Sequence, residues 1–157
     1  MSTSITIRPA DVQDLPAIHE LVRELAIYEK EEAAFTASLE DYQRDFTAGV
    51  FDCIVAEQEA QIVGMVLYYM SYSTWKGKML FLEDFVVKED WRQAGIGQVL
   101  FDAFLDKAKE LECRLVKWQV LDWNKPALAF YHKNAAIIET NWWNGKIFLK
   151  NQPHEHI

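Results

Sequence analysis

Hydrophobic and polar positions along the chain change their period several times, and these changes predict alternating strands and helices. Residues 4–8 alternate isoleucine with small polar residues, which is typical of a short strand, and Pro9 ends it. Asp11 has the character of a helix N-cap. The apolar residues after it recur at helical spacing: Leu15, Ile18, Val22 and Leu25. A second, shorter helix is predicted to begin at Ser38 and to end at Gly49.

From residue 51 onward the apolar runs take the character of strands. Residues 51–57, 62–72 and 79–87 are rich in β-branched and aromatic residues and predict an antiparallel meander. Four further elements are predicted after it: a helix over 97–111, a strand over 115–121, a short helix over 126–134, and a hairpin over 135–149 that turns near Asn144 and Gly145. Because the later helices alternate with strands, the pattern predicts an α/β protein with a mixed sheet and a βαβ crossover.

Composition narrows the class of protein. The chain has 157 residues, half of them apolar and a quarter charged, and no repeat or linker, so one domain is expected over residues 1–157. No run approaches the roughly 20 apolar residues that cross a bilayer. The N-terminal residues lack the pattern of a secretory signal, which favours a cytoplasmic location. The net charge of −8 argues against nucleic acid as a partner and favours a cationic small molecule.

The most informative chemical pattern is a glycine-bearing turn between an apolar strand and a helix. Gly95 and Gly97 stand where the helix begins, so backbone N–H groups and the positive end of the helix dipole are available to an anion. Arg92 adds a cation that suits a phosphate or pyrophosphate. The turn lacks the Gly-Lys-Ser/Thr of a P-loop, and Leu100 stands where a dinucleotide fingerprint needs a small residue. The alternative is an ordinary tight turn.

The turn and several other segments resemble a known enzyme family. Arg92-Gln93-Ala94-Gly95-Ile96-Gly97 is similar to the glycine motif of the GNAT acyl-CoA N-acyltransferases. Segments outside the turn resemble the diamine (spermidine/spermine) N-acetyltransferase branch over residues 5–136: Ile7-Arg8-Pro9-Ala10, Glu24-Leu25-Ala26-Ile27-Tyr28-Glu29, Tyr68-Tyr69, Trp75-Lys76-Gly77-Lys78, Leu82-Glu83-Asp84-Phe85, Trp123-Asn124-Lys125-Pro126 and Phe130-Tyr131. The resemblance implies a mixed central sheet of about seven strands flanked by four helices, and a homodimer.

The resemblance also implies a site for acetyl-CoA as cosubstrate, without a metal. In this family the cosubstrate lies where two parallel strands part. The implied contacts are Phe85, Val86 and Val87 for the pantetheine arm, Arg92, Gln93, Ala94, Gly95, Ile96 and Gly97 for the pyrophosphate, and Asn124, Lys125, Pro126 and Tyr131 for the arm and the thioester.

Two residues carry the implied chemistry. Tyr131 matches the tyrosine that acts as general acid in the family. A phenol beside the sulfur can protonate the departing thiolate. Glu83 matches the position that meets the amine, which is almost wholly protonated at neutral pH and must lose a proton before it attacks. Without the family resemblance, Tyr131 would be interpreted as an aromatic residue that packs against the sheet. Glu83 and Asp84 would be interpreted as solvated residues at the edge of the sheet. Their side chains are expected to point to opposite faces of the strand, unless a bulge intervenes.

The substrate-binding residues are implied with less detail. Tyr28 and Glu29 match positions that contact a distal amine, and Asp84, Trp75, Lys117 and Gln119 are further candidates for the pocket wall. The resemblance fades after Ala136, where Trp142 and Trp143 replace an expected acidic contact. This departure favours shorter diamines or lysine-like amino acids such as thialysine over long polyamines.

These observations predict an N-acetyltransferase that acts on a primary amine of a small cationic molecule. Direct transfer is expected, since Cys53 and Cys113 have no paired base in the sequence and are interpreted as reduced core thiols. Two alternatives stay open: acetylation of a protein lysine or N-terminus, and a non-catalytic module that binds acyl-CoA.

Overall fold

The computed structural model describes residues 4–149 and divides into two compact units, Met1–Trp118 and Gln119–Ile157. Within residues 4–149, the first unit holds a sheet and three α-helices, and the second holds one α-helix and an extended segment. Over the described range, no helix combines the length and apolar character needed to span a membrane.

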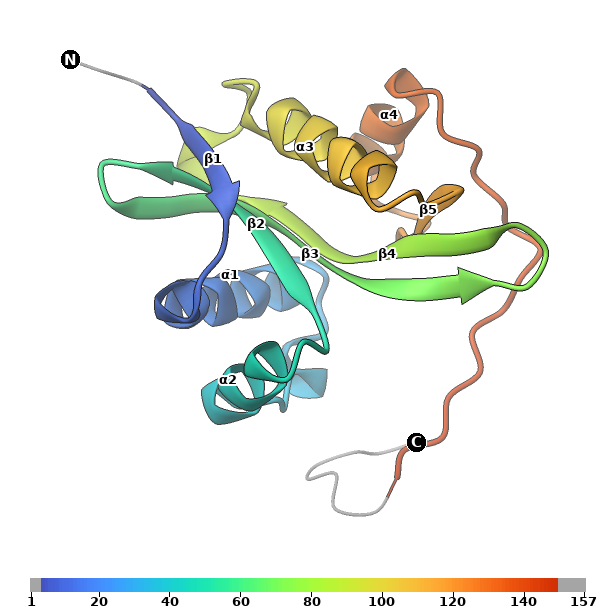
Figure 1. Cartoon of the computed structure of the whole chain (residues 1–157), viewed down its shortest axis with the longest axis horizontal. Helices are drawn as coiled ribbons and strands as arrows, with labels where there is room; N and C mark the ends of the chain where they lie inside the picture. The colour runs from blue at the N-terminus through green and yellow to red at the C-terminus, as the bar shows by residue number, and fades with distance from the viewer. Residues whose placement is uncertain (1–3, 150–157) are drawn as a thin grey trace. The chain divides into compact units, whose positions relative to one another are not determined.

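The first unit is built on one five-stranded sheet with the strands in sequence order (Figure 1). Neighbouring strands pair antiparallel from β1 to β4, whereas β4 and β5 pair in parallel. The strands are β1 (Thr6–Pro9), β2 (Asp52–Gln58), β3 (Gln61–Ser73), β4 (Gly77–Val87) and β5 (Leu115–Trp118). The predicted meander and crossover are therefore confirmed.

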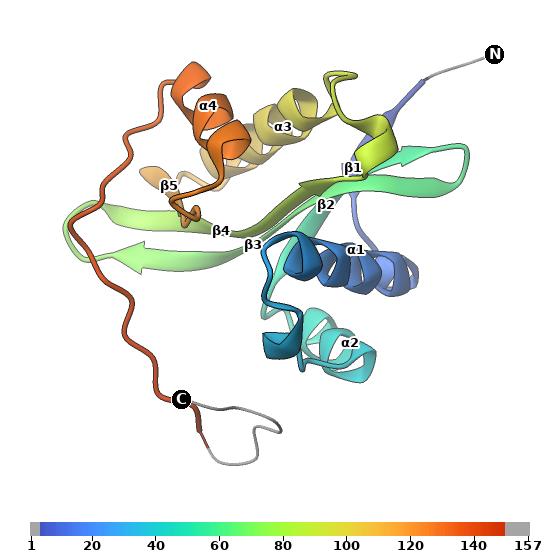
Figure 2. The ribbon, with the colours of Figure 1, turned by 180° about the vertical axis from the view of Figure 1, so that it is seen from behind.

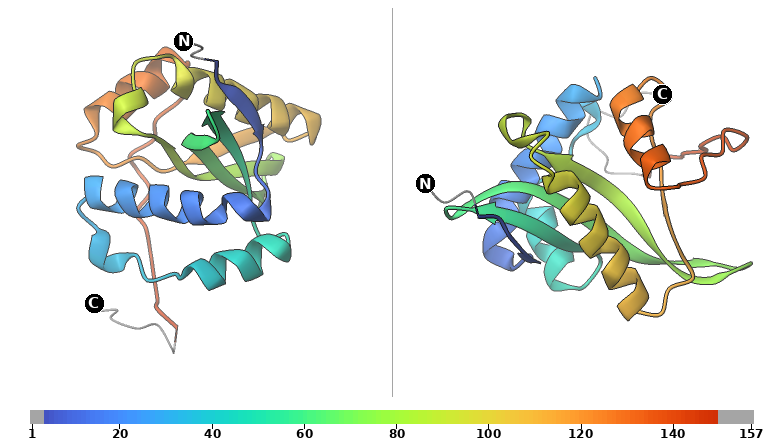
Figure 3. Two further views of the ribbon diagram at one scale, coloured as in Figure 1. Left: turned by 90° about the vertical axis from the view of Figure 1, so that its left-hand side faces the viewer. Right: turned by 90° about the horizontal axis from the view of Figure 1, so that it is seen from above.

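Helices cover both faces of this sheet. α1 (Leu15–Tyr28) and α2 (Leu39–Thr47) lie on one face, and α3 (Ile96–Glu110) crosses the other, as Figures 1 and 2 show from opposite sides. The left view of Figure 3 shows the same three layers edge-on. α4 (Lys125–Lys133) belongs to the second unit. Within the described residues the four predicted helices are confirmed with their ends shifted by a few residues.

Side-chain caps fix where the first helices begin. Asp11 and Asp14 form a reciprocal capping box, so a 3-10 turn over Val12–Asp14 precedes α1. The Arg8 guanidinium donates to both Asp14 oxygens at 2.8 and 2.9 Å and to Glu57 at 3.0 Å, which ties β1 to α1 and β2. Ser38 caps α2 in the same reciprocal manner, as the sequence predicted.

The core on the α1 face is a cluster of buried, mostly aliphatic residues that includes Leu15, Ile18 and Leu21 from α1. On the opposite face α3 approaches the sheet closely at Gly64. A Cβ at Gly64 would lie 3.0 Å from Leu100 Cδ1 and 3.2 Å from the Val86 carbonyl oxygen. The absence of a side chain there lets α3 sit directly over β3 and β4.

The predicted final hairpin is wrong for the described residues. Residues 136–149 form no strand, so the sheet has five strands rather than about seven. A hairpin is stable when its apolar face is covered, and here the large apolar side chains of the segment are exposed: Ile137, Trp142, Trp143, Ile147 and Leu149. The strand predicted over 115–121 also ends early, at Trp118, where its pairing with β4 stops.

Candidate active site

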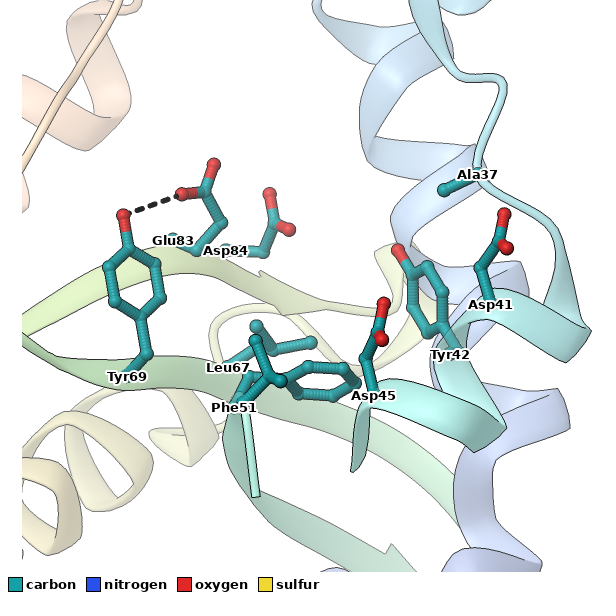
Figure 4. Close-up of a pocket in the computed structure, with 10 residues that line it drawn as sticks. Ala37, Asp41, Tyr42, Asp45, Phe51, Leu67, Tyr69, Glu83 and Asp84 are labelled. Atoms are coloured by element: carbon teal, nitrogen blue, oxygen red, sulfur yellow. Dashed lines mark hydrogen bonds between the residues drawn. The ribbon is translucent and has the colours of Figure 1, made fainter. Parts of the chain in front are cut away.

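A β-bulge on β4 determines how the two adjacent carboxylates are presented. Asp84 pairs with Leu67 of β3, but the next pair joins Leu82 to Tyr68, so Glu83 is an additional residue without a direct partner. In a regular strand neighbouring side chains point to opposite faces, and the bulge removes this alternation. Glu83 and Asp84 therefore face the same pocket (Figure 4).

The pocket lies between α2 and the strands β3 and β4, on the face of the sheet that carries α1 and α2. Its volume is about 330 Å³, which suits a small molecule. Its floor is apolar and its rim is acidic, and among the residues that the structure describes no lysine or arginine lines it. The lining residues are Ala37, Asp41, Tyr42, Asp45, Val50, Phe51, Leu67, Tyr69, Glu83 and Asp84.

The carboxylates of the pocket have different surroundings. The Tyr69 hydroxyl donates to Glu83 Oε1 at 3.3 Å, whereas Asp84 is partly buried. Burial, followed by the nearby charges of Glu83 and Glu29, raises the pKa of Asp84 to about 7. On the α2 side, the Arg44 guanidinium pairs with Asp41 and Asp45 at 3.1 Å each, on the exposed surface.

The other predicted substrate residues of the first unit lie outside this pocket. Tyr28 is the last residue of α1, and the Arg92 guanidinium lies 5.8 Å from its ring centroid. Glu29 caps α1 and is close enough to Asp84 to affect its ionisation. Trp75 is 85% exposed in the turn between β3 and β4. Lys117 of β5 lies opposite Phe81 of β4. Of these four residues, Glu29 alone acts electrostatically on Asp84.

The glycine turn has the geometry of an anion cradle. Gln93 and Gly95 have positive φ values of 69° and 81°, and Gly95 is the N-cap of α3 without any side-chain cap. A Cβ at Gly95 would meet no atom within 4 Å, so the space in front of the helix is open. Arg92 is anchored beside it, since its Nε donates to the Val87 carbonyl at 2.9 Å. These features fit a pyrophosphate.

An open strand edge leads to this cradle. The parallel pairing of β4 with β5 ends at Leu82 and Trp118, but β4 continues to Val87. The other edge of this stretch is paired with β3, where Phe85, Val86 and Val87 oppose Val66, Met65 and Gly64. Beyond Leu82 the outer edge of β4 is therefore not paired with β5, and this is the edge along which a pantetheine arm would place its amides.

The remaining predicted residues belong to the second unit. Asn124 caps α4, with its side-chain oxygen accepting from the Ala127 N–H at 3.3 Å, and Lys125 and Pro126 begin the helix. Tyr131 lies in α4 with its ring edge-on to Phe130. Gln119 donates to Asn144 in the same unit.

Sequence reasoning missed the contribution of α2 to the pocket. Asp41, Tyr42 and Asp45 line it, and so does Tyr69 from β3. The spacing of Asp41 and Asp45, four residues apart, does place both carboxylates on one face of a helix. That pattern is typical of any solvated helix, so it did not distinguish a pocket wall.

A glycine cradle at a helix N-terminus, an open strand edge beside it and an acidic pocket on the other face of the sheet are features that a coenzyme-dependent enzyme of cationic substrates would use. The model of the acetyltransferase (GNAT) family matches residues 15–136, and the chain belongs to this family. It is an acetyltransferase with the GNAT fold.

Curated relatives and solved structures agree with this assignment. The chain is 36% identical to the thialysine N-epsilon-acetyltransferase of Bos taurus over 152 residues, with 89% of each chain covered. It is 31% identical to the human spermidine/spermine N(1)-acetyltransferase-like protein 1, covering 83% of this chain and 20% of that protein. An aminoglycoside acetyltransferase from an uncultured soil metagenomic sample has the same fold, with a TM-score of 0.77 at 23% identity and coverage of 93% and 97%.

Proposed function

We propose that this acetyltransferase transfers the acetyl group of acetyl-CoA to a primary amine of a small cationic molecule, a diamine or a lysine-like amino acid such as thialysine. The observation that carries the proposal is the bulged pair Glu83 and Asp84, which presents two carboxylates to one small pocket without a lysine or arginine in its lining. The names of the curated relatives support small amines as substrates.

Residues of the first unit would hold the cosubstrate. The backbone of Gln93 to Gly97 and the Arg92 guanidinium would bind the pyrophosphate, because the N-terminus of α3 carries no side-chain cap. The outer edge of Phe85 to Val87 would hydrogen-bond the pantetheine amides, and one N–H there would stabilise the oxyanion of the thioester. Asn124, Lys125 and Pro126 are further proposed contacts, taken from the family resemblance.

The acidic pocket would bind the substrate as its ammonium form. Glu83 and Asp84 attract the cation, and the apolar floor of Phe51 and Leu67 accommodates a short methylene chain. A bound ammonium has no lone pair, so it must lose a proton before it attacks. Tyr28, Glu29, Trp75, Lys117 and Gln119 stay proposed contacts for the parts of the substrate outside this pocket.

Release of free CoA tests the reaction. We expect release from acetyl-CoA with at least one of putrescine, lysine and thialysine, and slower release with spermidine and with a lysine-containing peptide. Faster release with the peptide would favour a protein acetyltransferase. Release with none of these amines, together with ordinary acetyl-CoA binding, would favour the non-catalytic module.

Tyr131 is proposed as the general acid that protonates the departing thiolate. Tyr131→Phe removes one hydroxyl and keeps the ring that packs edge-on against Phe130. We expect acetyl-CoA to bind normally and kcat to fall at least tenfold, since positioned acids contribute roughly 10²–10⁴-fold. Phe130→Leu is the matched control in the same helix. Unchanged turnover in Tyr131→Phe would remove this residue from the mechanism.

We further propose that the two units act together as one catalytic domain and that the protein is a homodimer. The exposed apolar side chains of residues 136–149, among them Trp142 and Trp143, form the kind of surface that a second copy covers.

A further inference from the structure

The two carboxylates on the bulge are held in different ways. Glu83 is exposed and accepts a hydrogen bond from the Tyr69 hydroxyl at 3.3 Å. The Tyr69 ring is itself stacked on Phe81, with centroids 5.4 Å apart, so the hydroxyl is positioned by packing. Glu83 is therefore oriented by a neutral donor that leaves its second oxygen available to an ammonium.

Asp84 has no such partner. It lies opposite Leu67, a buried residue of the core, and it is partly buried itself. Among the described residues, no side chain or backbone N–H donates a hydrogen bond to its carboxyl group, and no cation pairs with it. An unpaired carboxyl group in such a place is unusual, because burial without a partner disfavours its charged form.

The groups that face Asp84 from the surrounding elements are acidic or neutral. Glu83 precedes it on β4, Glu29 ends α1, Tyr42 comes from α2 and the buried Cys53 from β2. Asp41 and Asp45 of α2 line the same pocket. Burial, followed by the negative charges of Glu83 and Glu29, raises the pKa of Asp84 to about 7. A carboxyl group of this kind exchanges protons at neutral pH, as a general base must.

We propose that Asp84 is the base that takes the proton from the bound ammonium, and that Glu83 holds the cation in place for this transfer. The assignment rests on the proposed function and differs from the family resemblance, which places Glu83 at the amine. The bulge makes the division possible, since it brings both carboxylates to one pocket while leaving Glu83 exposed and Asp84 partly buried.

The proposed step is balanced in protons and electrons. One N–H bond of the ammonium breaks, its proton passes to an Asp84 oxygen, and the lone pair left on nitrogen attacks the thioester carbonyl. The C–S bond then breaks and the thiolate takes the Tyr131 proton, while the second proton lost by nitrogen returns to the tyrosine. Asp84 releases its proton to water, so one proton leaves for each amide formed.

The test compares kcat/KM against pH for the unmodified protein and three variants, with acetyl-CoA and putrescine as substrates. In the unmodified protein we expect an acid limb with a midpoint near pH 7. Asp84→Asn should lower kcat/KM at least 100-fold at pH 7.5 and lose the midpoint near pH 7, so that kcat/KM follows the free amine and keeps rising about tenfold per pH unit up to about pH 9. Asp84→Glu should restore part of the limb.

Glu83→Gln gives the opposite pattern. It should raise KM for putrescine about tenfold but keep the acid limb, moved to lower pH, because removal of the neighbouring negative charge makes Asp84 easier to ionise. Acetyl-CoA Kd, measured by calorimetry, should stay within threefold in both variants, which shows that the fold and the cradle are intact.

Two results would overturn the assignment of Asp84 alone: Asp84→Asn keeping its acid limb with activity within threefold, or Glu83→Gln losing the limb. Absence of CoA release by the unmodified protein with every amine would instead overturn the proposed function, and the assignment with it.

Discussion

Gly95→Asp is expected to weaken acetyl-CoA binding at least 100-fold while leaving the fold intact. Gly95 has φ 81° and open space where a side chain would go, and aspartate tolerates this conformation better than most residues, at roughly 1 kcal/mol relative to glycine. Its carboxylate would stand in front of the N-terminus of α3, where the pyrophosphate is proposed to bind. One pair of like charges 5–6 Å apart costs about 3 kcal/mol at an effective dielectric constant near 20.

Gly95→Asn is the matched control, because it has the same shape and no charge. It should weaken acetyl-CoA binding by about tenfold or less, so the difference between the two variants isolates the electrostatic effect. Isothermal titration calorimetry gives both dissociation constants, and far-ultraviolet circular dichroism confirms that α3 is formed. Equal affinities for the two variants would mean that the phosphates bind elsewhere.

The cradle could be predicted because its parts are close in sequence. An apolar strand, Gly95 and an amphipathic helix follow one another directly, and each is a local signal. The positive φ of Gly95 and the start of α3 at Ile96 agree with that reading. The caps at Asp11 and Ser38 were predictable for the same reason, since a side chain that bonds to a backbone N–H two or three residues away depends on few other contacts.

The shared pocket of Glu83 and Asp84 could not be predicted from β4 alone. Alternation along the strand places neighbouring side chains on opposite faces, and the bulge arises from the register with Leu67 and Tyr68 on another strand. The wall formed by α2 was missed for a related reason. The exposed-looking residues Asp41 and Asp45 line a pocket only because the fold brings α2 beside β3 and β4.

The final hairpin was predicted from a local turn signal, and such a signal is not sufficient to form a hairpin. Asn144-Gly145 is a favourable hairpin turn, but a turn does not supply a covered apolar face. Trp143 is 95% exposed and Ile147 is 87% exposed, so the alternation around the turn is not matched by packing within the described residues.

The stability of the protein should depend on pH through Asp84, and Asp84→Asn should remove that dependence. The pKa of Asp84 is about 7 in the folded state against 3.8 for an unperturbed carboxyl group. Between these values the folded protein binds the proton more tightly than the unfolded chain, so the free energy of unfolding falls as pH rises. From pH 5 to pH 8 this group alone removes about 2–3 kcal/mol, by the linkage relation.

Asparagine has nearly the same shape and does not ionise, so its packing and hydrogen bonding change little with pH. Urea unfolding at pH 5 and pH 8 should therefore show Asp84→Asn gaining about 2–3 kcal/mol relative to the unmodified protein between the two conditions. Asp41→Asn is a control that should show no such change between pH 5 and pH 8. Hydrogen bonds from Ser38 and the Arg44 guanidinium lower the pKa of Asp41 below its ordinary value of 3.8, so its contribution is fully present at both pH values and is lost only on stronger acidification. A constant difference between Asp84→Asn and the unmodified protein at both pH values would show that the Asp84 carboxyl group is not held in an unfavourable charged state. A pH-dependent gain in the free energy of unfolding, accompanied by lost activity, is the expected signature of a base that folding keeps without a partner.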